Sequence, residues 1–186
     1  MIKYGGNPDY HYYYPNIQCV SGSLNVSNSL IGKSAWHGIY CSNASPAISY
    51  CTLSGNNYDG INCVGGSPVI SHNIFTNNGQ YAGQIINATG ALSSVHNSGE
   101  GNGVNGMLMT NCTITQNSGW TANLNFPYVI HSVTVDSGKV LTLAPGTLVK
   151  FSGVLTELIV KGRVEALGTA DSNIVFTSLK DDSLGG

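Results

Sequence analysis

The sequence predicts an all-β chain wound as a parallel solenoid of three sheets. Two observations point to this fold: the chain is poor in helix-favouring residues, and a 22-residue repeat runs through its first half. Gly occurs 24 times in 186 residues, and Asn, Ser and Thr occur 20, 21 and 13 times. These residues favour turns and short side-chain hydrogen bonds over helical backbone. We therefore expect short strands separated by turns.

Three lines of the sequence align at a period of 22 residues, and they start at Ile17, Ile39 and Ile61. A fourth line, from Gln84, is degraded, and the pattern recovers from Met107. Small or apolar residues recur at fixed places in each line, so we expect them to point inward and to stack as ladders. These ladder residues are Ile17, Ile39 and Ile61; Cys19, Cys41 and Cys63; Val26, Ile48 and Ile70; and Leu53 with Phe75.

Each period predicts three strands of about three residues, which in the second line are residues 39–41, 47–49 and 52–54. Turn residues such as Ser, Asn and Gly separate them. A unit this small cannot bury its apolar face alone, so it must stack on its neighbours. Stacked coils lie about 4.8 Å apart, the spacing of strands in a sheet. The result is a parallel β-helix.

The lines SPAISYCTLSGNNYDGINC and SPVISHNIFTNNG resemble the repeats of the pectin-lyase-like superfamily. The resemblance covers residues 17–118 and implies a right-handed parallel β-helix of the secreted or surface-displayed bacterial type. That superfamily includes lyases, hydrolases, adhesins and tailspikes, so the resemblance implies a fold and leaves the function open.

The composition changes near Phe126, after which Val and Leu increase and Asn becomes rare. The segments SGKVLTLAPGTLVKF, GRVEALGT and IVFTS resemble the opening coils of large bacterial surface β-helix proteins. We therefore expect two parts: residues 1–126 as repeat coils, clearest over 17–83 and degraded over 84–118, and residues 127–186 as a second β-helix-like segment. Both ends resemble the middle of a coil, so we expect a fragment whose partners include neighbouring β-helix modules.

Composition also bears on partners and location. The formal net charge is -2 and the few cations are scattered, which argues against nucleic-acid binding. No run of 18 apolar residues is present, so no membrane span is expected. The first residues lack the apolar region of a signal peptide. A secreted or cell-surface location follows from the family resemblance alone.

Carboxylates are sparse where catalysis would need them. A glycosidase needs two acids about 5–9 Å apart, yet Asp59 is the only acid between Asp9 and Glu100. Asp59 and Lys33 are the only formal charges within residues 17–83, and we expect at most a surface ion pair between them. We assign no catalytic residue and no cofactor, and expect no enzyme activity. Asp181 and Asp182 are the candidates for a calcium site.

Cysteines and histidines are expected to be structural or to have no role. The ladder cysteines should pack as buried small hydrophobes without disulfides, and Cys51 and Cys112 should be buried too. The histidines lack metal-ligand spacing and are expected at the surface. They are His11, His37, His72, His96 and His131.

Aromatic residues are concentrated near the start of the chain. Exposed rings combine an apolar face with a polar tip, which suits sugar binding. The candidate glycan platform consists of Tyr10, Tyr12, Tyr13, Tyr14, Trp36 and Tyr58. Three functions stay open: a structural or adhesive module that contacts polysaccharide or cell-surface glycans, a fragment of a carbohydrate-active β-helix enzyme, and a glycan-binding module without catalysis.

Overall fold

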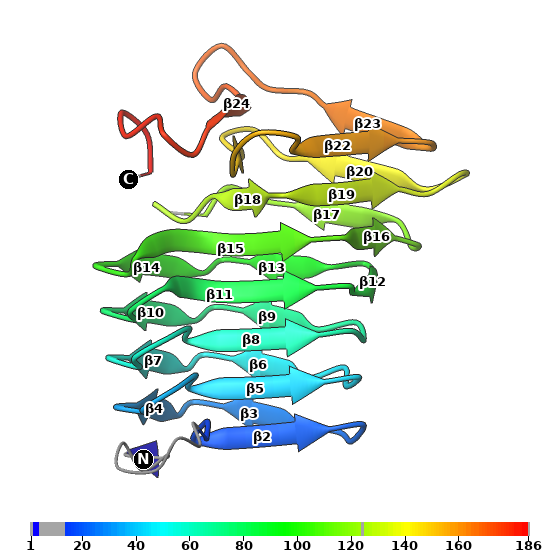
Figure 1. The fold of residues 1–186 in the computed structure, drawn as a ribbon. Helices are drawn as coiled ribbons and strands as arrows, with labels where there is room; N and C mark the ends of the chain where they lie inside the picture. The colour runs from blue at the N-terminus through cyan, green and yellow to red at the C-terminus, as the bar shows by residue number, and fades with distance from the viewer. Residues whose placement is uncertain (1, 4–13, 124, 186) are drawn as a thin grey trace.

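The computed structural model describes residues 2–3, 14–123 and 125–185, and it shows a parallel β-solenoid of about seven turns (Figure 1). The described residues contain strands, turns and no helix. Every pair of neighbouring strands in the five sheets is parallel, as the 22-residue period predicts.

The longest sheet has eight strands and runs the full height of the solenoid (Figure 1). Its strands occur once per turn, so each is hydrogen-bonded to the equivalent strand of the next coil. In spatial order they are β2 (Ile17–Val20), β5 (Ile39–Ser42), β8 (Ile61–Val64), β11 (Tyr81–Ile86), β15 (Val104–Thr110), β18 (Tyr128–Ile130), β21 (Leu148–Phe151) and β24 (Val175–Ser178).

Two further sheets complete the early coils. A four-stranded sheet contains β3 (Asn25–Ser27), β6 (Ala47–Ser49), β9 (Val69–Ser71) and β13 (Ser93–Val95). A five-stranded sheet contains β1 (Ile2–Lys3), β4 (Leu30–Gly32), β7 (Thr52–Ser54), β10 (Ile74–Thr76) and β14 (Ser98–Glu100).

In the later coils, near the change of composition, two other sheets replace the four-stranded and five-stranded sheets of the early coils. One contains β12 (Thr89–Gly90), β16 (Cys112–Ile114), β19 (Ser132–Val135) and β22 (Glu157–Val160). The other contains β17 (Ser118–Trp120), β20 (Val140–Leu143) and β23 (Arg163–Ala166). The eight-stranded sheet continues through this exchange, because β15 pairs with β18.

The interior is filled by in-register ladders. Ile17 faces Ile39 and Ile39 faces Ile61, and the neighbouring cysteines follow the same register. Ile39, Ile61, Leu53 and Phe75 are fully buried. The first coil is less covered, since Ile17 and Val26 are only partly buried. Further along, the Trp120 and Tyr128 rings stack with centroids 4.5 Å apart.

The coils turn at three corners that stack as columns, and each corner residue has a positive φ. Such backbone favours glycine and asparagine, which explains why these residues are so frequent. The first column is Ser21, Asn43, Gly65, Asn87 and Asn111; the second is Asn28, Tyr50, His72 and His96; the third is Lys33, Gly55, Asn77 and Gly101.

Buried asparagines follow two of these corners and hydrogen-bond from coil to coil. In one ladder, Asn78 Oδ1 accepts from Asn56 Nδ2 at 2.8 Å, and Asn78 Nδ2 donates to Asn102 Oδ1 at 2.8 Å. In the other, Asn73 Nδ2 donates to Asn97 Oδ1 at 3.1 Å. These amides satisfy backbone groups that the turns leave unpaired inside the protein.

All five cysteines are buried and free. Cys41 and Cys63 face each other across β5 and β8. Their thiol–thiol hydrogen bond lowers the pKa of Cys41 and, together with burial, raises the pKa of Cys63 well above its ordinary value. Burial alone raises the pKa of Cys51 and Cys112.

Candidate functional site

The outward face of the eight-stranded sheet carries a row of uncharged polar side chains. Successive residues of a strand point to opposite faces, so Tyr40 lies outside while Ile39 and Cys41 lie inside. Gln18 faces Tyr40, Tyr40 faces Asn62 and Asn62 faces Gln84 in the register of β2, β5, β8 and β11. One phenol and three amides are therefore aligned up the axis.

Aromatic rings gather beside this row. The Trp36 and Tyr40 rings stack with centroids 5.3 Å apart and an interplanar angle of 29°. The imidazole of His37 lies 4.2 Å from the Trp36 ring and meets the edge of Tyr58 at 5.8 Å. Trp36 and Tyr58 come from equivalent turns, because the Tyr58 N–H donates to the Trp36 carbonyl at 3.1 Å. Both rings are half-buried.

Asp59 lies beneath these rings and is completely buried. Its Oδ2 accepts from Asn62 Nδ2 at 2.9 Å and lies 3.1 Å from His37 Nδ1. Its Oδ1 accepts from the Tyr81 N–H at 3.0 Å and from Gln84 Nε2 at 3.4 Å. A buried carboxylate requires such donors. Asp59 therefore organises the site from below, and its oxygens are occupied by the protein.

The expectation of surface histidines is wrong for His37, which is only 5% exposed. His37 and Asp59 occupy the same position in successive repeats, so the stacking of the coils brings them together. The expected surface pair between Asp59 and Lys33 is likewise replaced by this buried contact. The Asp59 N–H also donates to His37 Nδ1 at 3.3 Å.

One polar atom of the Asn62 side chain has no hydrogen-bond partner among the described residues. Its side chain is buried except for 7%, and its Oδ1 has no partner within the described part of the chain. An unpaired buried acceptor costs free energy, about 1–3 kcal/mol.

Only part of the predicted glycan platform forms a cluster among the described residues. Tyr10, Tyr12 and Tyr13 lie outside the described residues, and Tyr14 is 56% exposed. Trp36 and Tyr58 share the cluster around His37. Sequence reasoning missed Tyr40, Asn62 and Gln84, although their place between two ladder positions of each strand identifies them as outward residues.

The remaining candidates lie elsewhere. Glu100 ends β14 in the five-stranded sheet, whereas Asp59 lies in the loop between β7 and β8. Hydrogen bonds from Ser183 and Thr177 lower the pKa of Asp181, whose main-chain oxygen accepts from Lys150 Nζ at 2.8 Å. Among the described residues no three His, Cys, Asp or Glu side chains form a metal-binding group, and the calcium site stays a prediction.

The fold and this face define a parallel β-solenoid with an aromatic and amide surface. No family model, no curated protein and no solved structure matches the chain. No helix within the described residues is long and apolar enough to cross a membrane.

Proposed function

We infer that this chain is a structural or adhesive module of a secreted or cell-surface protein and that it binds glycans without cleaving them. The pectin-lyase-like resemblance belongs to the same proposal. The observation that carries it is the stacked Trp36–Tyr40 pair beside the amides of Asn62 and Gln84. Aromatic faces pack against the apolar C–H faces of sugars, and amides hydrogen-bond their hydroxyls.

The charges at this face favour uncharged polysaccharides as the ligand. The row of Gln18, Tyr40, Asn62 and Gln84 carries no cation that could pair with a uronate. Asp59 is the acid beneath it, and burying a second carboxylate close by would be unfavourable. A neutral sugar meets neither difficulty.

The arrangement of carboxylates within the described residues supports binding over cleavage. Hydrolysis needs a proton donor and a base or nucleophile on either side of one bond. Both oxygens of Asp59 are engaged by donors of the protein. Stacked coils instead offer many weak contacts, which add up when modules are repeated.

Affinity electrophoresis in gels that contain neutral or acidic polysaccharides tests this proposal. We expect neutral polymers such as xylan to retard the protein and Tyr40→Ala to lose about tenfold in affinity, as a central aromatic contact does. Tyr50→Asn is the matched control. It removes an exposed aromatic ring from the second corner column and places there the residue type found at Asn28. Release of reducing sugar by the purified chain, abolished in Asp59→Asn, would contradict the proposal.

A further inference from the structure

Three stacked aromatic side chains stand on the second corner column, between the four-stranded and five-stranded sheets of the early coils. The Tyr50 and His72 rings have centroids 4.6 Å apart and an interplanar angle of 19°. The His72 and His96 rings continue the stack at 4.8 Å and 26°. All three side chains are exposed. Two imidazoles therefore lie side by side at the surface of neighbouring coils.

The sequence alone conceals this pair of histidines. His72 and His96 are 24 residues apart, whereas metal-ligand motifs place histidines a few residues from each other. They come together because β9 pairs with β13, with Ser71 opposite Val95 at the residues just before them. The pair is thus a product of coil stacking.

The backbone fixes the starting points of both side chains. His72 and His96 share the left-handed conformation of the corner column, with φ 57° and 55°. The His72 N–H donates to the Val95 carbonyl at 3.1 Å. The residues that follow, Asn73 and Asn97, are buried and hydrogen-bonded to each other. The two histidines are therefore held one coil apart before any ligand binds.

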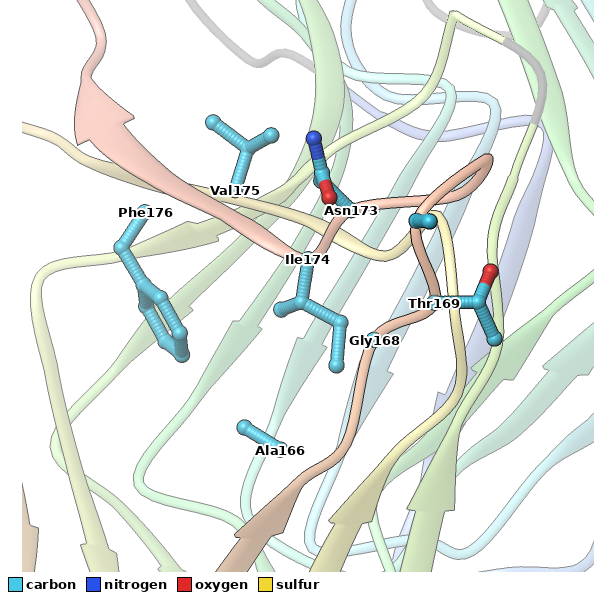
Figure 2. A pocket seen from close by; sticks show the side chains of 8 residues that line it. Ala166, Gly168, Thr169, Asn173, Ile174, Val175 and Phe176 are labelled. Carbon is cyan, nitrogen blue, oxygen red and sulfur yellow. The ribbon is translucent and has the colours of Figure 1, made fainter.

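Both imidazoles are available to a ligand. Neither forms a side-chain hydrogen bond or an ion pair with another residue in the described part of the chain. Neutral imidazole is the commonest metal ligand in proteins. By contrast, the hollow of about 760 Å³ in Figure 2 is lined by residues such as Ala166, Thr169 and Phe176, and no histidine, cysteine or carboxylate is among them.

The spacing of the two rings suits a single metal ion. Nitrogen ligands bind at about 2.0–2.1 Å, so two imidazoles on one ion, at an angle of about 90–110°, have centroids about 4.5–5.3 Å apart. The observed separation of 4.8 Å lies within this range. The stacked rings must turn before their lone pairs converge on one point. Histidine χ2 is a broad torsion, and both side chains are exposed, so they can make this turn.

The type of donor selects the type of ion. Imidazole suits Cu²⁺, Ni²⁺ and Zn²⁺, whereas Ca²⁺ and Mg²⁺ prefer oxygen ligands. Among these ions Cu²⁺ binds a given set of nitrogen ligands most tightly. Within the described residues no third histidine, cysteine or carboxylate joins the pair, which leaves the remaining coordination positions to water.

We propose that His72 and His96 together bind one transition-metal ion, Cu²⁺ most tightly, at the second corner of the solenoid. This site lies apart from the aromatic and amide face of the eight-stranded sheet, so the proposal is independent of glycan binding. It is also distinct from the predicted calcium site, which would use the carboxylates of Asp181 and Asp182.

Titration calorimetry tests the site with Cu²⁺, and with Ni²⁺ as an ion that does not oxidise thiols. We expect one ion per chain and a loss of affinity of about tenfold or more in His72→Asn and in His96→Asn, because one imidazole then binds alone. Asparagine occupies the same column at Asn28, so both variants suit the backbone conformation. His131→Asn removes another exposed histidine and should bind the ions as the wild type does.

Electron paramagnetic resonance of the copper-loaded wild-type chain identifies the ligands without any substitution. Two coordinated imidazoles should give hyperfine splitting from two nitrogen nuclei, and the double variant of His72→Asn and His96→Asn should lose this signal. Equal affinity of the double variant and the wild type would overturn the proposal. A wild-type spectrum with a single nitrogen ligand, or with a sulfur ligand, would overturn it as well.

Discussion

The Nδ1 atom of His37 lies 3.1 Å from Oδ2 of Asp59, and neither side chain is accessible to more than a trace of solvent. The two residues are 22 positions apart in sequence and one coil apart in space. This contact holds the turn that presents Trp36 against the turn that presents Tyr58. The site therefore depends on the same stacking that builds the fold.

Removing this carboxylate should destabilise the protein strongly. Asp59→Ala leaves the donors of Asn62 and Tyr81 without their acceptor and removes the buried contact with His37. We expect a loss of about 3–5 kcal/mol in the free energy of unfolding, measured by urea denaturation. Glu100→Ala, at an exposed position, should change it by less than about 0.5 kcal/mol. Equal effects of the two substitutions would mean that Asp59 has no such structural role.

The asparagine ladder should be nearly as sensitive, and a neighbouring asparagine supplies the control. Asn78 is buried and bonds to Asn56, Asn102 and the Leu53 carbonyl. Asn78→Ala should cost about 3 kcal/mol, since several buried groups lose their partners. Asn77 is exposed with φ 54°, so Asn77→Gly should be almost neutral. Thermal unfolding of both variants measures the difference. If Asn78→Ala leaves the stability unchanged, the asparagine ladder does not stabilise the fold.

High pH should unfold the protein through buried hydroxyl and thiol groups. Burial raises the pKa of Tyr128 from 10.0 to about 12. The folded state therefore holds this proton more tightly, and the stabilisation is complete below pH 10 and lost between pH 10 and about pH 12. The loss amounts to about 3 kcal/mol, since each pKa unit corresponds to about 1.4 kcal/mol. Tyr128→Phe should flatten this part of the stability curve. An unchanged alkaline profile in that variant would assign the effect to the thiols.

Native and unfolded chains should differ in thiol reactivity. All five cysteines are buried, and burial raises the pKa of several of them, so few thiolates are available in the folded state. We expect slow reaction with Ellman's reagent in native buffer and five reactive groups in denaturant. Three or fewer reactive groups after unfolding would reveal a disulfide.

The ladders of the early coils could be predicted because their register follows from one number, the period of 22. Leu53 and Phe75 align in the sequence and pair in the sheet. The direction of side chains at the turns could not be predicted in this way, because inward and outward residues alternate only within strands. A positive φ at Gly55 and Asn77 redirects the next residue, so Asn56 and Asn78 point inward. His37 lies at a turn as well. Its polar side chain predicts a surface position, but its contact with Asp59 in the next coil requires it to be buried.

Fluorescence of Trp36 gives the most direct test of glycan binding at this face. The chain has two tryptophans, and Trp120 is completely buried beside Tyr128. Trp120→Phe therefore leaves a single reporter at the proposed site. Titration with a neutral polysaccharide should shift its emission and saturate, and Tyr40→Ala should weaken the response about tenfold. An emission spectrum that stays unchanged at every concentration of neutral and acidic polysaccharides, in a folded protein, would contradict the proposal.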